Sequence, residues 1–143
     1  MFCMENRSFL EEMLRGMSPH QRTIDRIARR LRKSLSDSKI FTNVGYDNVV
    51  LGEEGECDIL ALCGFYSGKR KYALIFEVKS SKTQEHKQKA IEQLEKDERD
   101  VKAFYGEDVR CFKFSVYTSN NYFRNSKWVG KPYDIVLVRK KKD

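Results

Sequence analysis

The sequence predicts an α/β protein in which a mixed central β-sheet is covered by helices on both faces. Segments with helical and strand periodicity follow one another as helix, three strands, helix, strand and final strand. Hydrophobic residues make up 40% of the chain and aromatic residues 12%, which is enough for a packed core. A chain of 143 residues has the length of one compact domain, so we expect a single domain over residues 1–143.

Charge and composition restrict the classes of partner and compartment. Lys and Arg total 28 against 21 Asp and Glu, and the net charge of +7 favours a polyanion such as DNA. The sequence has no long apolar run and no basic start followed by an apolar stretch, so we expect no membrane segment and an intracellular, cytoplasmic location. It has no Gly-rich phosphate loop either, so we expect no nucleotide cofactor.

The cysteines do not form a pattern typical of a zinc site. The 4 cysteines include no C-x-x-C pair, and His20 and His86 are the only histidines. Cys57 and Cys63 lie in a predicted strand, which suits buried thiols in a reducing compartment.

Two helical patterns occupy the N-terminal part of the chain. Residues 5–15 predict a short helical segment that ends at Gly16. A stronger helix is predicted to begin after Ser18, a suitable N-cap, with Pro19 at its first position. Its apolar stripe predicts packing on the core. Its other faces carry six cations: Arg22, Arg26, Arg29, Arg30, Arg32 and Lys33.

The arrangement of these helices leaves two interpretations open. One is a core-packing helix whose solvated basic face could hold backbone phosphates without reading bases. The other is a helix-turn-helix DNA reader centred on Gly16.

Three strand patterns follow. Residues 40–52 predict the first strand, with a break or bulge at Gly45. Residues 55–63 and 71–79 predict two apolar strands, and residues 64–70 between them are suited to a hairpin loop.

Charged side chains interrupt the apolar pattern at one end of this hairpin. Glu77 and Lys79 project from the same face of their strand. A symmetric hairpin would place Asp58 opposite Lys79, and Glu77 opposite Leu60. Asp58 and Glu77 would then be diagonal neighbours on one face. Buried acids are costly unless they are paired or bind an ion, so the pattern predicts a shared divalent cation.

This set of residues has the chemistry that a metal-dependent phosphodiesterase needs. Carboxylate oxygens of Asp58 and Glu77 suit Mg²⁺ or Mn²⁺. The ion would polarise a phosphate and lower the pKa of a water, while Lys79 would orient that water or offset charge on the phosphate. Glu56 shares the face of Asp58, and it is either an accessory ligand or part of a solvated acidic turn.

Asp58 and the later sequence 77–79, Glu-Val-Lys, resemble the PD-(D/E)XK nuclease superfamily, whose restriction-endonuclease-like fold includes archaeal Holliday-junction resolvases. Residues 55–59, Gly-Glu-Cys-Asp-Ile, are similar to the Gly-Glu-x-Asp-hydrophobic strand of many members. The resemblance covers residues 18–118, and Cys57 stands in place of the Pro in the family name.

The resemblance implies a three-layer restriction-endonuclease-like sandwich and a Mg²⁺- or Mn²⁺-dependent DNA endonuclease. It implies that Asp58, Glu77 and the backbone carbonyl of Val78 bind the metal, with Lys79 assisting the attacking water. In this fold the first helix can contribute an acid, and Asp25 is the candidate. The alternative for Asp25 is a surface carboxylate among arginines. In some branches the helix after the Lys carries a Gln, matched by Gln93, although Asp97 replaces the Tyr of that branch.

The second half of the chain completes the predicted fold. A helix is expected over residues 84–105, and strands are expected over 110–118 and 133–138. Residues 120–128 are polar, aromatic and basic, and they either contact nucleic acid or close the edge of the core. The basic tail 139–143 is expected to add salt-sensitive attraction to DNA.

The sequence therefore predicts a divalent-metal-dependent DNA endonuclease. Cutting both strands of a duplex would favour a homodimer, because one metal site cuts one strand. The alternative is a DNA-binding protein without catalysis, either a helix-turn-helix-like regulator or an inactive nuclease fold. A third interpretation is purely structural, with Lys79 in a salt bridge to Asp58 or Glu77. The candidate phosphate contacts are Arg22, Arg26, Arg29, Arg30, Lys82, Lys87 and Lys89.

Overall fold

The computed structural model describes residues 19–48, 53–65, 70–118, 123–124, 127–128 and 133–139. Its elements are α2 (Pro19–Ser34), β1 (Ser38–Asn48), β2 (Glu53–Cys63), β3 (Tyr72–Lys79), α3 (Gln84–Tyr105), β4 (Arg110–Thr118), β5 (Phe123–Arg124), β6 (Lys127–Trp128) and β7 (Tyr133–Val138). The predicted helical segment 5–15, residues 140–143 of the predicted tail and most of 120–128 lie outside the described residues.

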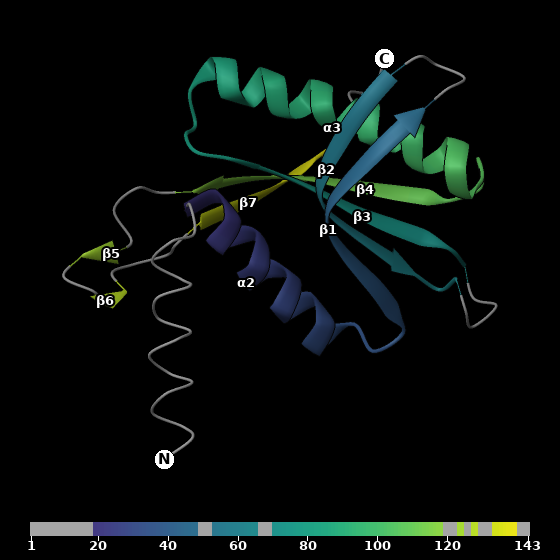
Figure 1. Ribbon diagram of the computed structural model, residues 1–143, viewed down its shortest axis with the longest axis horizontal. Coiled ribbons are helices and arrows are strands. Elements are labelled where there is room, and N and C mark those ends of the chain that lie inside the picture. Colours follow the sequence, from purple (N-terminus) through teal and green to yellow (C-terminus); the bar gives the residue numbers. More distant parts are fainter. Residues whose placement is uncertain are drawn as a thin grey trace.

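A mixed sheet forms the centre of the molecule, with α2 and α3 on opposite sides of it (Figure 1). The strand order is β1-β2-β3-β4-β7, and β5 pairs separately with β6. The only parallel neighbours in the described sheet are β3 and β4, which α3 connects. A parallel pair needs such a crossover, whereas the antiparallel pairs need none. The predicted α/β class, with a mixed sheet and helices on both faces, is confirmed.

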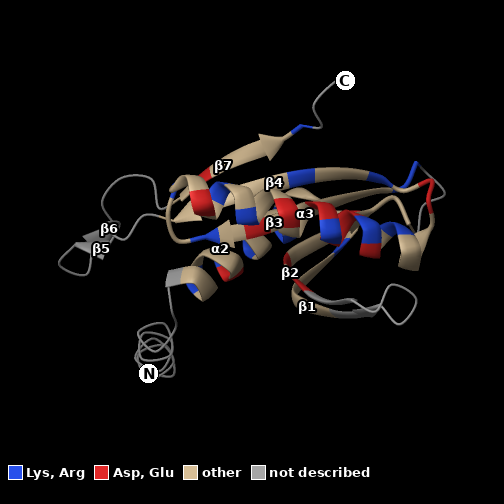
Figure 2. Cartoon of the chain, turned by 90° about the horizontal axis from the view of Figure 1, so that it is seen from above, with Lys and Arg blue, Asp and Glu red and all other residues tan. Residues whose placement is uncertain are grey.

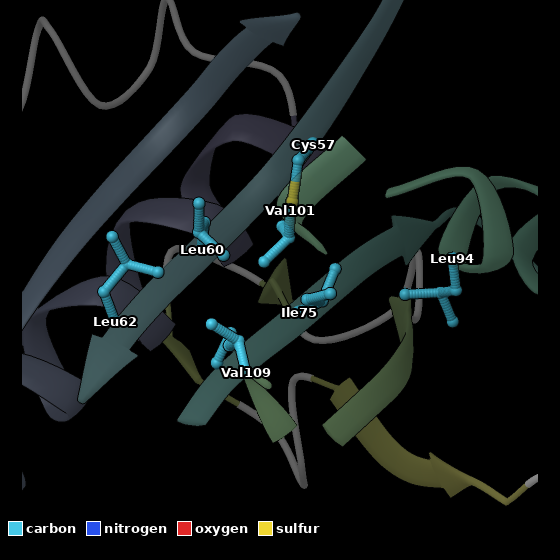
Figure 3. Packing of buried hydrophobic residues seen from close by; sticks show 8 residues of the cluster. Cys57, Leu60, Leu62, Ile75, Leu94, Val101 and Val109 are labelled. Carbon is cyan, nitrogen blue, oxygen red and sulfur yellow. The ribbon is translucent and has the colours of Figure 1, made fainter. Parts of the chain in front are cut away.

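Each helix covers its own hydrophobic layer. On the α3 side, Leu60, Ile75 and Leu94 belong to one buried cluster (Figure 3). On the α2 side, Ile59 and Phe76 belong to a second cluster, together with residues of α2 and β4. Neighbouring residues on β2 and β3 thus point to opposite layers, as expected for strands buried on both faces. Among the described helices, none combines the length and apolar character needed to cross a membrane.

The helix ends agree with the capping residues in the sequence. The side chain of Thr83 accepts a hydrogen bond from the His86 amide, and α3 begins at the next residue after this cap. Gly106 follows the last turn with φ of 117°, a conformation that disfavours side chains. The predicted helix 84–105 is therefore confirmed.

The register of the β2–β3 hairpin differs from the prediction. Leu60 pairs with Ile75 and Ile59 pairs with Phe76, so Glu77 is not opposite Leu60. The prediction was wrong by two residues, because the loop was taken to be symmetric. A shift of two residues leaves the paired residues from Ile59 to Cys63 on their predicted faces. Continued by one residue, the observed register places Asp58 opposite Glu77.

The irregularity in β1 lies at Asn43, not at Gly45 as predicted. Gly45 pairs normally with Glu56. Asn43 has φ of 52°, in the left-handed region that Asn tolerates better than most residues, and the β1–β2 pairing skips it. The interrupted position lies across from Asp58.

The side chains of β2 change face beside that position. Cys57 belongs to the α3-side cluster and Ile59 to the α2-side cluster. Residues two apart in a regular strand share a face, so the alternation is broken at Asp58.

Candidate functional site

Three carboxylates meet in the interior at the end of β3. Asp58 of β2 is 7% exposed, Glu77 of β3 is 3% exposed, and Asp97 of α3 is fully buried. Glu77 is close to both of the others, since hydrogen bonding and charge from both act on its carboxyl group. None of the three forms an ion pair with Lys or Arg within the described parts of the chain. Such a group is unstable in its fully ionised form unless a cation is bound.

The protonation of Glu77 and Asp97 reflects this crowding. Burial, followed by the neighbouring Asp97 and Asp58 carboxyls, raises the pKa of Glu77 to about 11. Burial also raises the pKa of Asp97 to about 6, although hydrogen bonds with Glu77 and Gln93 oppose the rise. Without a cation, the pair therefore holds a proton at neutral pH.

Asp58 faces a different set of partners. Its Oδ2 accepts a hydrogen bond from the Val78 amide at 2.7 Å and lies 3.4 Å from Nε2 of His20. Burial alone would raise the pKa of Asp58, but the hydrogen bonds from His20 and Val78 outweigh it and lower that pKa. Asp58 is therefore the ionised member of the three carboxyls.

His20, in the first turn of α2, is absent from the residues that the sequence predicted for the site. Its Nε2 lies 3.1 Å from the carbonyl oxygen of Val78, as well as near Asp58. The hydrogen bond with Asp58 raises the pKa of His20, and burial opposes that rise. One signal was available: His20 follows the predicted helix start at Pro19, and the first turn of a core-packing helix lies at one end of the sheet.

The structure places the other predicted catalytic groups at the same end of β3. The backbone of Val78 joins Asp58 and His20, while its side chain is buried in the α2-side cluster. Lys79 is half-buried, and its charge opposes protonation of His20. The predicted salt bridge of Lys79 to Asp58 or Glu77 does not occur among the described ion pairs.

The three accessory candidates lie in different places. Gln93 donates one amide hydrogen bond to Asp97 at 3.1 Å and one to the Glu56 carbonyl at 3.0 Å, so it joins α3 to β2 beside the carboxylates. The side chain of Glu56 is exposed, and only its backbone carbonyl contacts this network. Asp25 accepts a hydrogen bond from Gln21 at 3.1 Å, so the structure pairs it within α2 instead of with the carboxylates.

Asp97 and Cys57 are further members of the site that the sequence did not predict. Ligand atoms of Cys57, Glu77 and Asp97 all lie within 4.8 Å of one another. Burial, followed by the charges of Asp97 and Glu77, raises the pKa of the Cys57 thiol well above its usual range. Asp97 could have been recognised because it occupies a position of the buried stripe of α3 between Leu94 and Val101.

The basic candidates are spread over both helices. Arg29 and Arg30 are exposed on α2, whereas Arg22 and Arg26 are half-buried there. Lys82, Lys87 and Lys89 are exposed in and before α3. Lys82 pairs with Asp134 and Lys89 with Glu85. Figure 2 shows that Lys and Arg alternate with Asp and Glu along α3, so the lysines there do not form a uniformly basic face.

Comparison of the chain with protein-family models, curated proteins and solved structures found no match. The chemistry of the site is therefore the basis for assigning a function. Carboxylate oxygens and a backbone carbonyl near the end of one strand are ligand types that Mg²⁺ and Mn²⁺ accept.

Proposed function

We propose that the protein is a divalent-metal-dependent DNA endonuclease that hydrolyses phosphodiester bonds with Mg²⁺ or Mn²⁺. One observation carries the proposal: the carboxyls of Asp58 and Glu77 and the carbonyl of Val78 gather where β2 and β3 stop pairing, directly before Lys79. The proposal includes a restriction-endonuclease-like sandwich. It is supported by α3, which follows Lys79 as the long helix does in the superfamily that the sequence resembles.

Each ligand has a separate structural support. The amide of Val78 holds Asp58, and this hydrogen bond orients the carboxylate toward the Val78 peptide. Glu77 brings an oxygen, Oε1, that has no hydrogen-bond partner among the described residues. His20 would hold the Asp58 carboxylate in place, because its Nε2 lies 3.4 Å from Oδ2 of Asp58 and 3.1 Å from the Val78 carbonyl oxygen. When bound, the ion supplies a Lewis acid for the phosphate and lowers the pKa of a water.

Lys79 and His20 would assist the reaction beside the Val78 peptide. Lys79 would offset negative charge that develops on the phosphate, or orient the attacking water. His20 would fix the position of the Asp58 carboxylate by hydrogen bonding. Both groups sit on regular elements, so their positions are preorganised.

The exposed cations would hold DNA by its phosphates. Arg29 and Arg30 extend from α2, whose N-terminal turn carries His20, and Lys82 follows Lys79 closely in sequence. The surface ion pair of Lys82 with Asp134 contributes little, so a phosphate can replace it. A second copy of the chain would be needed to cut both strands, and we therefore include a homodimer in the proposal.

The test is incubation with Mg²⁺ or Mn²⁺ and a panel of single-stranded, duplex, flapped and four-way-junction DNAs. Wild type should cut at least one member of the panel, and Lys79→Ala should be slower by about 10²-fold or more. Lys71→Ala is the matched control, because Lys71 is exposed just before the opposite end of β3. Cleavage of no substrate, or equal cleavage by wild type and Lys79→Ala, would overturn the proposal. DNA binding without cleavage would favour the non-catalytic alternative.

A further inference from the structure

Cys57, Glu77 and Asp97 form a compact cluster on the α3 side of the sheet. One ligand atom from each residue lies within 4.8 Å of the other two, and the three side chains come from β2, β3 and α3. Cys57 and Asp97 are fully buried, and Glu77 is 3% exposed. Residues distant in the sequence therefore place one sulfur and two carboxyl groups around one point in the interior.

Two oxygens of this cluster lack a partner. Neither Glu77 Oε1 nor Asp97 Oδ2 has a hydrogen-bond partner among the described residues, although both are buried. Gln93 donates its hydrogen bond to the other oxygen of Asp97, Oδ1, so Oδ2 receives no hydrogen bond from it. Buried polar atoms are almost always satisfied, so these two oxygens beside a thiol need either a proton shared between the two acids or a bound cation.

We propose that Cys57, Glu77 and Asp97 bind a borderline-soft divalent cation of the Zn²⁺ type, adjacent to the proposed Mg²⁺ site. A thiolate combined with carboxylates selects Zn²⁺ or Co²⁺ over Mg²⁺, which prefers oxygen ligands alone. Three protein ligands leave a fourth position of a tetrahedral ion open. Ligand atoms bound to one ion at about 2.0–2.3 Å lie closer together than the present limit of 4.8 Å, so the side chains would close slightly on binding.

The break in the alternation of β2 separates this site from that of Asp58. Cys57 points into the α3-side cluster, whereas the Asp58 carboxylate is held by the Val78 amide next to His20 of α2. Glu77 is close to both Asp58 and Asp97 and is the one residue common to both sites. An ion on the α3 side would therefore keep Glu77 ionised and available to the second cation.

The spacing of cysteines in the sequence does not reveal such a site. Only one ligand is a cysteine, and the other two are carboxylates from other elements. The absence of a C-x-x-C pair excludes the common zinc motifs, but not a mixed site assembled by the fold.

The alternative is a closed acid pair in which Glu77 and Asp97 share a proton and Cys57 is an ordinary buried thiol. The two interpretations differ in whether sulfur bonds to a metal. Cobalt reports this directly, because a Co²⁺–thiolate bond gives an intense sulfur-to-metal charge-transfer absorption in the near ultraviolet. That absorption does not depend on DNA or on catalysis.

The experiment is a Co²⁺ titration of the full chain after metal removal with a chelator. We expect a charge-transfer band that saturates at one thiolate-bound Co²⁺ per chain. Zn²⁺ should bleach the band at stoichiometric amounts, and a large excess of Mg²⁺ should leave it unchanged. A folded wild type without the band, or a band that Mg²⁺ removes as readily as Zn²⁺, would overturn the proposal.

Variants identify the ligands. Cys57→Ser and Asp97→Asn should each lose the band, and Asp97→Asn keeps the size of the side chain and an oxygen for Gln93. A variant in which Cys3, Cys63 and Cys111 are all replaced by Ser is the matched control and should retain it. A band that persists in Cys57→Ser, or disappears in the control while the control stays folded, would assign the thiolate elsewhere and refute the site.

The same samples separate this inference from the proposed nuclease function. Lys79→Ala should lose cleavage and keep the cobalt band, because Lys79 is not a ligand in this cluster. A band in a wild type that cuts no DNA would leave the metal site intact and refute the nuclease. Cleavage by a wild type without the band would support the nuclease function and refute the metal site.

Discussion

The Asp58 carboxylate accepts a hydrogen bond from the Val78 amide at 2.7 Å, where the β2–β3 pairing has ended. The last backbone pair between the two strands is Ile59 with Phe76. Beyond this pair, the side chain of Asp58 instead of its backbone forms the hydrogen bond to β3. The strands stay connected through this hydrogen bond, while Oε1 of Glu77 has no hydrogen-bond partner among the described residues. This relationship makes the site a part of the sheet and underlies the predictions that follow.

Mg²⁺ or Mn²⁺ will raise the unfolding temperature of the wild type, and Glu77→Gln will remove the rise. Ligand at about 100 times its Kd adds about 2.7 kcal/mol to the free energy of unfolding. That corresponds to roughly 10 °C for a domain of this size. Calorimetry with and without the ion measures it. Glu92→Gln, which changes a carboxylate on the exposed surface of α3, should behave as wild type. An undiminished rise in Glu77→Gln would exclude that residue as a ligand.

Asp97→Asn will stabilise the metal-free protein at pH 7. Burial raises the pKa of Asp97 from 3.8 to about 6, so the folded state holds this proton more tightly than the unfolded chain. Ionisation therefore costs stability as the pH rises from about 4 to 6, on the order of 2–3 kcal/mol.

The measurement for Asp97→Asn is urea unfolding at pH 4 and pH 7 in the presence of a chelator. The free energy of unfolding of the variant should not show the decrease between pH 4 and pH 6 that ionisation of Asp97 causes in the wild type. The exposed Asp108→Asn is the control. A variant less stable than wild type at pH 7 would show that the Asp97 carboxylate has a stabilising partner.

His20→Asn will destabilise the metal-free protein at pH 5.5 more than at pH 8.5. The hydrogen bond with Asp58 raises the pKa of His20 above 6.5, so its contribution is fully present below pH 6.5 and is lost as the pH rises through the folded value. The imidazole is partly exposed, so we expect less than about 1 kcal/mol. His86→Asn, whose ring contacts Ser81, serves as the control. A loss of stability independent of pH would contradict the His20–Asp58 pair.

Arg29→Glu or Arg30→Glu will weaken DNA binding measured with Ca²⁺ in place of Mg²⁺. Each lost phosphate contact should lower the slope of log K against log salt by about 0.9. Fluorescence anisotropy at several salt concentrations gives the slope. Arg110→Glu makes the same charge change on β4, outside α2, and should leave the slope unchanged. Equal slopes in all the proteins would remove α2 from the DNA-binding surface.

Asn43→Val will lower the free energy of unfolding by about 1–2 kcal/mol, and Asn43→Gly will change it little. The φ of 52° is costly for a β-branched side chain and free for Gly. Both variants lose the hydrogen bond from Asn43 to Gln21, so their difference isolates the backbone. Chemical denaturation measures it, and equal stability of the two variants would contradict a left-handed residue at this position.

The order of the elements was predictable because their signals are local. Helix 84–105 and strands 110–118 and 133–138 each contain their own periodicity and end signals. The closeness of Asp58 and Glu77 was predictable because both lie near the same end of one hairpin, although the alternation of β2 breaks at Asp58. The exact pairing did not, since hairpin register depends on loop geometry that a symmetric count of residues cannot supply.

His20 and Asp97 were missed for a tertiary reason. Each approaches Glu77 or Asp58 only through the way its helix packs on the sheet, and helix packing is not encoded by neighbours in the sequence. A carboxylate within the apolar stripe of α3 was nevertheless visible between Leu94 and Val101. A buried acid at a core position is an indication of function, because its burial is costly unless something compensates for it.

The side-chain alternation of β2 is interrupted at Asp58, so that Cys57 packs in the α3-side cluster and Ile59 packs in the α2-side cluster. A register shift of one residue between β2 and β1 or β3 would move the side chains of β2 to the opposite faces of the sheet. The same shift would separate the carboxyl group of Asp58 from that of Glu77. A mispaired molecule would thus be poorly packed and would also lack the cluster of Asp58, Glu77 and Asp97. If the proposed cation binds, recovery of its affinity after refolding would therefore measure the fraction of molecules with correctly paired strands.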